Sequence, residues 1–448
     1  TGYSAITSYT VGHNNGAGTD YTVVEQSVTA PTATATFTGL TTGTEYTFVV
    51  TPVNVHDSGT ASATFTYKAA EKPSQPSAPV ISQTTDSTAV TYTWTAPATD
   101  NGEAITSYQL LFFSVTDTNT YVEKTALCNA NIDPVFTALT CSVEMADLKS
   151  TLGVSPGEFL KAKIVATNVK GSSDASEASA DSIKVQEKPQ VAPANLAGTS
   201  TKDSITLTWD AITLDAEKGY YDIAEYRVYQ TAPTAIGLVA TVTSGTTTTL
   251  TSLTPAGSDF TYQVKAYNIH GEATLAATYT ILLAGIPDTM AAPVLTQSGT
   301  AIVFTWTNPT DNGEALTDIN LLLYQEDTTV YTEYESLCNG TAVLNAAGNS
   351  CSIEMADLTN DAGVADFTVG NDITAKVTAT NAKGTSTESA ASNALKAQSA
   401  PISTVTIDTG TASSTATTIT IDWNHLTADA DTGYSAITSY TVGHNNGA

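Results

Sequence analysis

The sequence AVTYTW (89–94) decides the fold, because it recurs in the same form three more times along the chain. The other copies are SITLTW (204–209), AIVFTW (301–306) and TITIDW (418–423). In each copy, apolar and polar residues alternate up to a tryptophan, which is the pattern of a half-buried β-strand. Copies that lie roughly 100 residues apart predict a series of small β-modules, each with a tryptophan in its core.

The sequence around each tryptophan predicts further strands. A polar Asp/Asn/Gly loop and a second alternating segment follow it, for example ITSYQLLF from Ile105. Next comes an alternating strand that ends in asparagine, then a turn with glycine and a last strand rich in Ser, Thr and Ala. Long helical periodicity is absent, so the predicted fold class is all-β, a string of antiparallel β-sandwiches. The strands that end in asparagine span 46–54, 160–168, 260–268 and 373–381.

Proline-containing linkers at 68–79, 184–193, 284–293 and 396–401 mark the predicted boundaries. Linkers this short that contain proline are semi-rigid, which favours a stiff string of modules. We expect three complete modules, and one further module that is split between the two ends of the sequence. The predicted segments are 1–70 (first segment), 77–187 (second module), 190–285 (third module), 291–396 (fourth module) and 399–448 (last segment).

The sequence also repeats itself. TGYSAITSYTVGHNNGA occurs at 1–17 and again at 432–448, an offset of 431 residues (432 − 1). This identity predicts a four-module period of 431 residues in a tandem array or fibre, with a continuous polypeptide running from one period into the next. The last segment would then supply the first strands of the split module, and the first segment the rest.

Composition excludes one class of partner. The net charge is −28 and Arg227 is the only arginine, whereas nucleic-acid binding needs clustered Lys and Arg. No run of about 18 apolar residues is present, so no membrane segment is expected in this sequence. An acidic surface keeps long assemblies soluble by mutual repulsion.

Four cysteines form two equally spaced pairs, Cys128 with Cys141 and Cys338 with Cys351, each 13 residues apart (141 − 128 and 351 − 338). No CxxC motif or nearby histidine accompanies them, so we predict two local disulfides instead of metal sites. Disulfides imply an extracellular or cell-surface location. The alternative is four reduced, buried thiols. Both pairs lie in modules that also share a DNGE loop and an EMADL segment.

Acidic loops are weak candidates for Ca²⁺. A calcium site needs six to eight oxygen ligands, and one loop offers two or three, so a neighbouring module would have to contribute. The alternative is a polar turn that needs glycine. The candidate residues are Asp100, Glu103, Asp311, Glu314, Asp215, Glu217, Asp429 and Asp431.

The sequence contains no GxSxG motif, no HExxH motif and no glycine-rich phosphate loop. We therefore assign no catalytic residue and no cofactor, and do not expect an enzyme. Asn339 begins the only N-glycosylation sequon, Asn339-Gly340-Thr341, so an extracellular chain could carry a glycan there. The alternative is an unused sequon.

These modules resemble fibronectin type III domains. The resemblance rests on the four tryptophans, on an Ile-x-x-Tyr motif in the following strand, and on the strand that ends in asparagine. The stretch LTTGTEYTFVV (40–50) is similar to the tyrosine-corner region of that family through Leu40 and Tyr46. Leu160 and Ile373 replace the corner tyrosine in the cysteine modules, and Ile319 replaces a strand tyrosine. The resemblance implies spacers, adhesion modules or scaffolds, as in large tandem cell-surface proteins.

The predicted function is that of a structural protein, the building block of an extracellular filament whose partners are copies of itself. One alternative is the stalk of a cell-surface adhesin. Another is a glycan-binding module, which would need clustered exposed aromatic residues. The tyrosines to examine for that role are Tyr121, Tyr220, Tyr221, Tyr331 and Tyr334.

Overall fold

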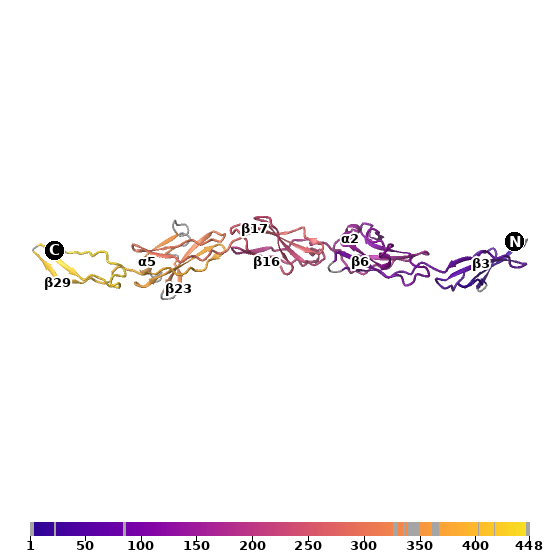
Figure 1. Cartoon of the computed structure of the whole chain (residues 1–448), viewed down its shortest axis with the longest axis horizontal. Helices are drawn as coiled ribbons and strands as arrows, with labels where there is room; N and C mark the ends of the chain where they lie inside the picture. Colours follow the sequence, from indigo (N-terminus) through magenta and orange to yellow (C-terminus); the bar gives the residue numbers. More distant parts are fainter. Residues whose placement is uncertain are drawn as a thin grey trace. The chain divides into compact units, whose positions relative to one another are not determined.

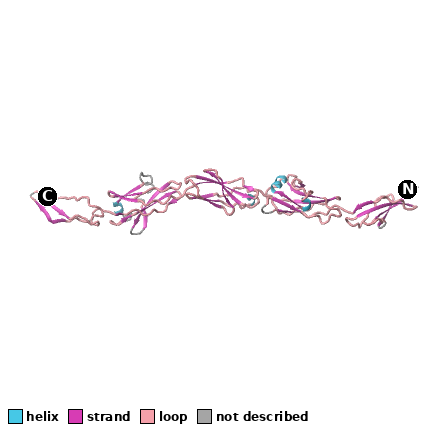
Figure 2. Ribbon diagram, viewed as in Figure 1, coloured by secondary structure: helices cyan, strands magenta, loops and turns pink. Residues whose placement is uncertain are grey.

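The computed structural model describes residues 4–21, 24–83, 87–325, 330–334, 337–338, 349–360, 367–401, 403–415 and 417–444. Antiparallel β-strands make up most of the regular structure, with a few short helices (Figure 2). Figure 1 labels several of these elements along the chain. The chain divides into two compact units, 1–193 with 211–226 and 265–276, and 194–210 with 227–264 and 277–448.

Two antiparallel sheets form the second module. The first has the order β5-β6-β9 and the second β11-β10-β7-β8. Trp94 directly follows β6 and, with Tyr92 and Tyr108, belongs to a buried core between strands of both sheets. The strands are β5 (Val80–Ser82), β6 (Ala89–Thr93), β7 (Ser107–Ser114), β8 (Thr120–Glu123), β9 (Thr140–Glu144), β10 (Ala162–Asn168) and β11 (Gly171–Ser172).

The second module also contains two helices, which the alternating sequence pattern does not predict. They are α1 (Val135–Ala138) and α2 (Met145–Leu152). The EMADL segment begins α2, whose residues Met145, Leu148 and Leu152 are buried at helical spacing. A disulfide joins Cys128 to Cys141 in β9, with their Cα atoms 6.2 Å apart.

The fourth module repeats this arrangement. Its first sheet has the order β20-β21-β24, its second β23-β22-β26-β27, and β25 pairs with β28. A second disulfide joins Cys338 to Cys351, and the EMADL segment again starts a helix. The elements are β20 (Val294–Ser298), β21 (Ala301–Thr305), β22 (Leu316–Gln325), β23 (Val330–Glu333), β24 (Ser350–Glu354), α5 (Met355–Asn360), β25 (Asp372–Ile373), β26 (Ala375–Asn381), β27 (Gly384–Thr385) and β28 (Leu395–Lys396).

Residues 190–285 contribute a sheet of order β12-β13-β16 and a second of order β15-β14-β17-β18, with β19 also paired to β17. Trp209 follows β13 and is buried. The elements are β12 (Ala197–Ser200), β13 (Ile205–Thr208), α3 (Asp215–Lys218), β14 (Glu225–Ala232), β15 (Gly237–Val242), β16 (Thr247–Leu250), β17 (Asp259–Asn268), β18 (Gly271–Glu272) and β19 (Ala277–Leu282).

The predicted Ser/Thr/Ala-rich last strand is wrong for the second and fourth modules. Serines there recur every third residue, and no strand is assigned over 173–183. Each serine donates its backbone N–H to a carbonyl of the neighbouring strand and accepts that same residue's N–H with its hydroxyl. Ser176 does so with Ile164, at 2.9 and 3.0 Å. We name these the serine ladders: Ser173, Ser176 and Ser179 beside β10, and Ser386, Ser389 and Ser392 beside β26.

The two end segments carry different strands. The first segment forms one four-stranded sheet of order β2-β1-β3-β4, and in it Tyr46 accepts the N–H of Thr41 at 2.8 Å, the bond of a tyrosine corner. The last segment forms a two-stranded hairpin. The strands are β1 (Ile6–His13), β2 (Val24–Thr29), β3 (Glu45–Asn54) and β4 (Phe65–Lys68), then β29 (Ile407–Ser414) and β30 (Ile419–Trp423).

One sequence therefore adopts two states. ITSYTVGH forms β1 at 6–13, where it pairs with β2 and β3. The identical residues 437–444 form no strand. His13 is 1% exposed, whereas the equivalent His444 is exposed. Local propensity is the same in both copies, so the neighbouring strands decide whether this sequence becomes a strand.

Candidate functional site: the joints between modules

The four linkers make the same backbone contact with the loop that follows each tryptophan. In every case a linker N–H donates to a carbonyl of that loop. Such bonds tie the linker to the module that it enters, so the linker does not act as a free tether. The pairs are Glu71 to Asn101 at 3.1 Å, Glu187 to Gly219 at 2.8 Å, Gly285 to Asn312 at 3.0 Å and Ser399 to Gly433 at 3.0 Å.

At three of these joints an asparagine completes the connection. Asn268, at the end of β17, donates its side-chain amide to the carbonyls of Glu187 in the linker and Lys218 in the loop, at 2.8 and 2.9 Å. Its side-chain oxygen accepts the N–H of His270 at 2.9 Å, and its side chain is fully buried. One side chain thus holds a linker, a loop and a turn together.

Asn168 and Asn381 make the same set of bonds. Asn168 donates to Glu71 and Asp100 at 2.8 and 2.9 Å. Asn381 donates to the carbonyls of Gly285 and Asp311 at 2.9 and 3.0 Å. Their side-chain oxygens accept the N–H groups of Lys170 and Lys383, each at 2.8 Å. We name Asn168, Asn268 and Asn381 the joint asparagines. The sequence pattern shows that these strands end in asparagine but predicts no role for that residue.

Glycines allow the backbones to approach closely at the joints that lead into the cysteine modules. Gly102 lies against Gly43, and a Cβ added to Gly102 would lie 2.5 Å from the nitrogen of Gly43. Gly313 lies against Gly257 in the same way. Because Gly102 and Gly313 also have φ values of 87° and 92°, any other residue would be strained there.

The other two joints use a tyrosine. Tyr220 packs over Gly157 of the second module, and a Cβ on that glycine would lie 2.6 Å from the tyrosine hydroxyl. Tyr434 packs over Gly370 of the fourth module in the same manner. The joints therefore alternate between glycine on glycine and tyrosine on glycine, in step with the alternation of cysteine and cysteine-free modules.

The acidic candidates lie in the loops of these joints, where their observed partners belong to the protein. Asp100 and Asp311 accept the N–H groups of Gly102 and Gly313 through their carboxylates, at 2.9 and 3.1 Å, and so shape the turns. Glu103 pairs with Lys68 at 3.3 Å.

The remaining acidic candidates make separate contacts. Asp215 pairs with Lys218 at 3.4 Å, and Asp431 accepts the hydroxyl proton of Ser403 at 2.5 Å. Glu217, Asp429 and Glu314 contribute backbone carbonyls, which accept from Gln190, Tyr434 and the side-chain amide of Asn381. Across the described ranges, no three His, Cys, Asp or Glu side chains converge to hold a metal ion. The calcium hypothesis stays a prediction.

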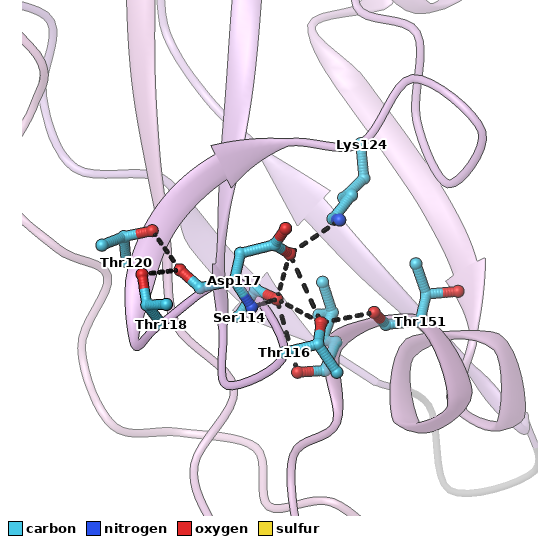
Figure 3. Close-up of polar contacts among 8 residues, drawn as sticks. Ser114, Thr116, Asp117, Thr118, Thr120, Lys124 and Thr151 are labelled. Atoms are coloured by element: carbon cyan, nitrogen blue, oxygen red, sulfur yellow. Dashed lines mark hydrogen bonds and ion pairs between the residues drawn. The ribbon is translucent and has the colours of Figure 1, made fainter.

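A polar cluster stabilises the turn between β7 and β8 next to the disulfide loop (Figure 3). The carboxylate of Asp117 accepts the hydroxyl proton of Ser114 at 2.6 Å and pairs with Lys124 at 2.7 Å. The Lys124 ammonium first, and then the Ser114 hydroxyl, lower the pKa of Asp117. Thr116 donates to the carbonyl of Thr151 in α2 at 3.2 Å, so the cluster also fastens that helix. Every charge in it has a protein partner, as expected for a structural cluster.

The five tyrosines considered for glycan binding are only partly exposed. Tyr121 and Tyr331 occupy equivalent places in two modules, each beside an aromatic ring and under a lysine, Lys163 at 5.0 Å and Lys376 at 4.3 Å. Tyr220 belongs to a joint, and Tyr334 packs against the core of the fourth module. Tyr221 lies edge-on to His270, with ring centroids 5.5 Å apart. These contacts give each tyrosine a structural role.

Two further sequence predictions concern glycosylation and membranes. Asn339 lies outside the described residues. Among the helices that the structure describes, none is long and apolar enough to span a membrane.

Three comparisons with known proteins add little to the structure. No family model matches the sequence. No curated protein matches it either. Among solved structures, the chain is similar to a crystal structure of the FN1-FN3 domains of chicken CNTN1. The identity is 17%, the alignment covers 72% of this chain and 98% of that chain, and the TM-score is 0.28. So distant a likeness carries no argument about this chain.

Proposed function

We propose that this chain is a structural protein, the repeating unit of an extracellular filament, and that its joints set a fixed step from one module to the next. The observation that carries this proposal is the identical bonding of the three joint asparagines. An enzyme or a soluble receptor needs one site, whereas a filament needs the same joint at every step.

Energetics support stiff joints. Each asparagine joint contains at least one backbone bond from linker to loop, and two bonds donated by the asparagine amide. At about 0.5–1.5 kcal/mol for each hydrogen bond, such a joint gains roughly 2–4 kcal/mol over a free linker. A linker with that gain is closed most of the time, so bending at the joint is rare.

Two other features suit an extracellular filament. The disulfides brace the second and fourth modules and persist only in oxidising surroundings. The net charge of −28 opposes lateral aggregation of long assemblies. The modules would then act as fibronectin type III-like spacers.

The proposal is tested by electron microscopy of the 448-residue chain and of native assemblies. We expect a narrow distribution of end-to-end distances for the chain, and an axial period equal to four modules in the assembly. Replacing all three joint asparagines with alanine should broaden the distribution. A matched control replaces Thr167, Thr261 and Thr380 with alanine, because these lie on the same strands and lose only a hydroxyl bond within their own modules. A broad distribution for the unmodified chain, or equal broadening by the control, would contradict the proposal.

The second candidate is the stalk of a cell-surface adhesin, which the same joints would also favour. The two functions differ in their neighbours. A filament has contacts between copies of this repeat at every period, whereas a stalk has contacts only along its own chain. Native assemblies without contacts between copies would favour the stalk.

A further inference from the structure

The first segment leaves one face of its sheet open. A groove of about 610 Å³ lies on this face, lined mainly by apolar side chains. Phe65 and Tyr67 are 63% and 53% exposed, and Val50 is 38% exposed. In the second module the equivalent of Val50 is Ile164, counted back from the asparagine that ends each strand, and it is completely buried. The difference is that β6 and β9 supply core residues over that sheet in the second module.

The last segment carries a hairpin of the kind that is missing from this face. Ile419, Ile421 and Trp423 alternate along β30, and Ile419 is 79% exposed. In each of the three modules at 77–396, the strand that leads to the tryptophan has neighbours on both sides, β5 and β9, β12 and β16, or β20 and β24. β30 pairs with β29 alone among the described strands. Its second edge is therefore open to another strand.

Residues 34–37 of the first segment match the strand that would fill this edge. TATFTGL (34–40) aligns with TTTLTSL (247–253), which begins with β16. The turn residues Gly39 and Ser252 both have positive φ, 74° and 60°, so the two backbones share an unusual conformation at the aligned position. Burial alternates in the same phase, with Thr36 and Thr249 both exposed. No strand is assigned at 34–37.

The third module gives the register. There Ile205 lies opposite Leu250 and Thr206 opposite Thr249, with the two threonine hydroxyls 2.9 Å apart. Counting from the tryptophans at 209 and 423, Ile419 and Thr420 are the equivalents of Ile205 and Thr206. Transferred to the end segments, this register puts Ile419 opposite Phe37 and Thr420 opposite Thr36.

The joints make an independent argument. At each joint a linker residue donates its N–H to the carbonyl of a loop residue. At three joints the asparagine amide donates to two carbonyls, that of the same linker residue and that of the residue immediately before this loop residue. At the fourth joint these carbonyls are those of Ser399 and Thr432. The asparagine in the equivalent strand is Asn54, at the end of β3. The fourth joint is therefore incomplete without a residue of the first segment.

We propose that the open face of the first segment binds the β29–β30 hairpin of a second copy of this chain. β30 of one copy then pairs with 34–37 of the next, and Asn54 completes the fourth joint. Tyr9 takes the place of its identical counterpart Tyr440, whose ring lies 5.7 Å from that of Trp423 in the hairpin's own copy. Exchange of identical elements costs little, because the contacts that are lost are the contacts that are regained. This inference rests on the proposed function, since it names the contact by which one period follows another. The same pairing would join neighbouring periods of a continuous polypeptide.

Disulfide trapping between two variants of the full chain tests the register. One variant carries Thr420→Cys and the other Thr36→Cys, and the two are mixed and mildly oxidised. All four native cysteines are already in disulfides. The matched control replaces Thr36→Cys by Thr34→Cys, two residues out of register and on the same side. Directly opposed strand residues have Cβ atoms about 5 Å apart and diagonal ones up to about 7–8 Å apart, so we expect at least a tenfold higher yield for the Thr36 pair.

Asn54→Ala provides a second measurement. Placed in the Thr36→Cys variant, it should lower the yield of crosslinked dimer about tenfold or more, because two bonds to the hairpin's copy are lost. Equal yields for the two cysteine pairs would overturn the inference, as would dimers of like variants only, or no dimer. None of these results affects the joints within one chain. If the joints are stiff but no register-specific dimers form, this inference is wrong and the proposed function is unaffected. If such dimers form but the joints are flexible, the proposed function is wrong and the contact between copies is confirmed.

Discussion

The substitution Asn268→Ala isolates the contribution of a joint asparagine. It removes two donated bonds of 2.8 and 2.9 Å to the carbonyls of Glu187 and Lys218, and one accepted bond of 2.9 Å from the N–H of His270. The side chain is fully buried, so water does not readily replace these partners. We expect the linker and loop to open more often, while the strands of the module stay paired.

The expected magnitude follows from the three lost bonds. At about 0.5–1.5 kcal/mol each, with part of the loss recovered by relaxation, the free energy of opening this joint should fall by roughly 2–3 kcal/mol. Since every 1.4 kcal/mol is tenfold, the population of the open joint rises about 30- to 150-fold.

Amide hydrogen exchange on the full chain measures this population. The reporters are the N–H groups of Glu187 and Gln190, which donate to the carbonyls of Gly219 and Glu217 at 2.8 Å each. Their exchange should accelerate by the same factor. The corresponding amides at the Asn381 joint, Gly285 and Asp288, serve as internal controls and should not change.

Asn268→Asp sharpens the test. It keeps the oxygen that accepts from His270 but sets a carboxylate against two carbonyls, so at neutral pH the joint should open at least as often as in the alanine variant. The reasoning is refuted if exchange at Glu187 and Gln190 stays within threefold of the unmodified chain, or if aspartate is better tolerated than alanine.

Three further predictions concern single groups. Removing the disulfide with Cys128→Ala and Cys141→Ala should destabilise the second module by about 3 kcal/mol, given the separation of 13 residues, and limited proteolysis should then cleave that module before the fourth. Lys124 lowers the pKa of Asp117, so this carboxylate stabilises the turn at neutral pH and the effect is lost as the pH falls through its lowered pKa; Asp117→Asn should abolish that acid dependence in a denaturant titration. Burial lowers the pKa of His13, so the stability of the first segment should fall as the pH drops below about 6.5, with a proton NMR titration giving the lowered pKa directly.

Much of the fold could be predicted from the sequence because two signals are local. Alternation up to each tryptophan corresponds to β6, β13, β21 and β30, and the predicted strand at 260–268 differs from β17 by one residue. The predicted string of β-sandwiches is the observed fold class. These elements are predictable because strict alternation of apolar and polar residues indicates a half-buried β-strand.

Other features could not be predicted, because they depend on partners distant in sequence. Helix α2 is short, and its apolar spacing at Met145, Leu148 and Leu152 covers only two turns. The joint asparagines lie 50 to 97 residues from the carbonyls that they bind, so their role appears only in three dimensions. Identical residues at 6–13 and 437–444 adopt different states, which no local rule could separate.

The serine ladders have a consequence for a protein built from many similar sheets. A bare strand edge exposes N–H and C=O groups that can pair with any passing strand, and repeated sequences make such mispairing common. Along β10, the N–H and the C=O of each of Ala162, Ile164 and Ala166 are both hydrogen-bonded to one serine. The serine hydroxyls also have acceptors, such as the carbonyls of Asp174 and Glu177. A strand of a neighbouring molecule therefore finds no unpaired backbone groups at these positions. Closely packed copies can then form specific contacts without pairing their sheets edge to edge.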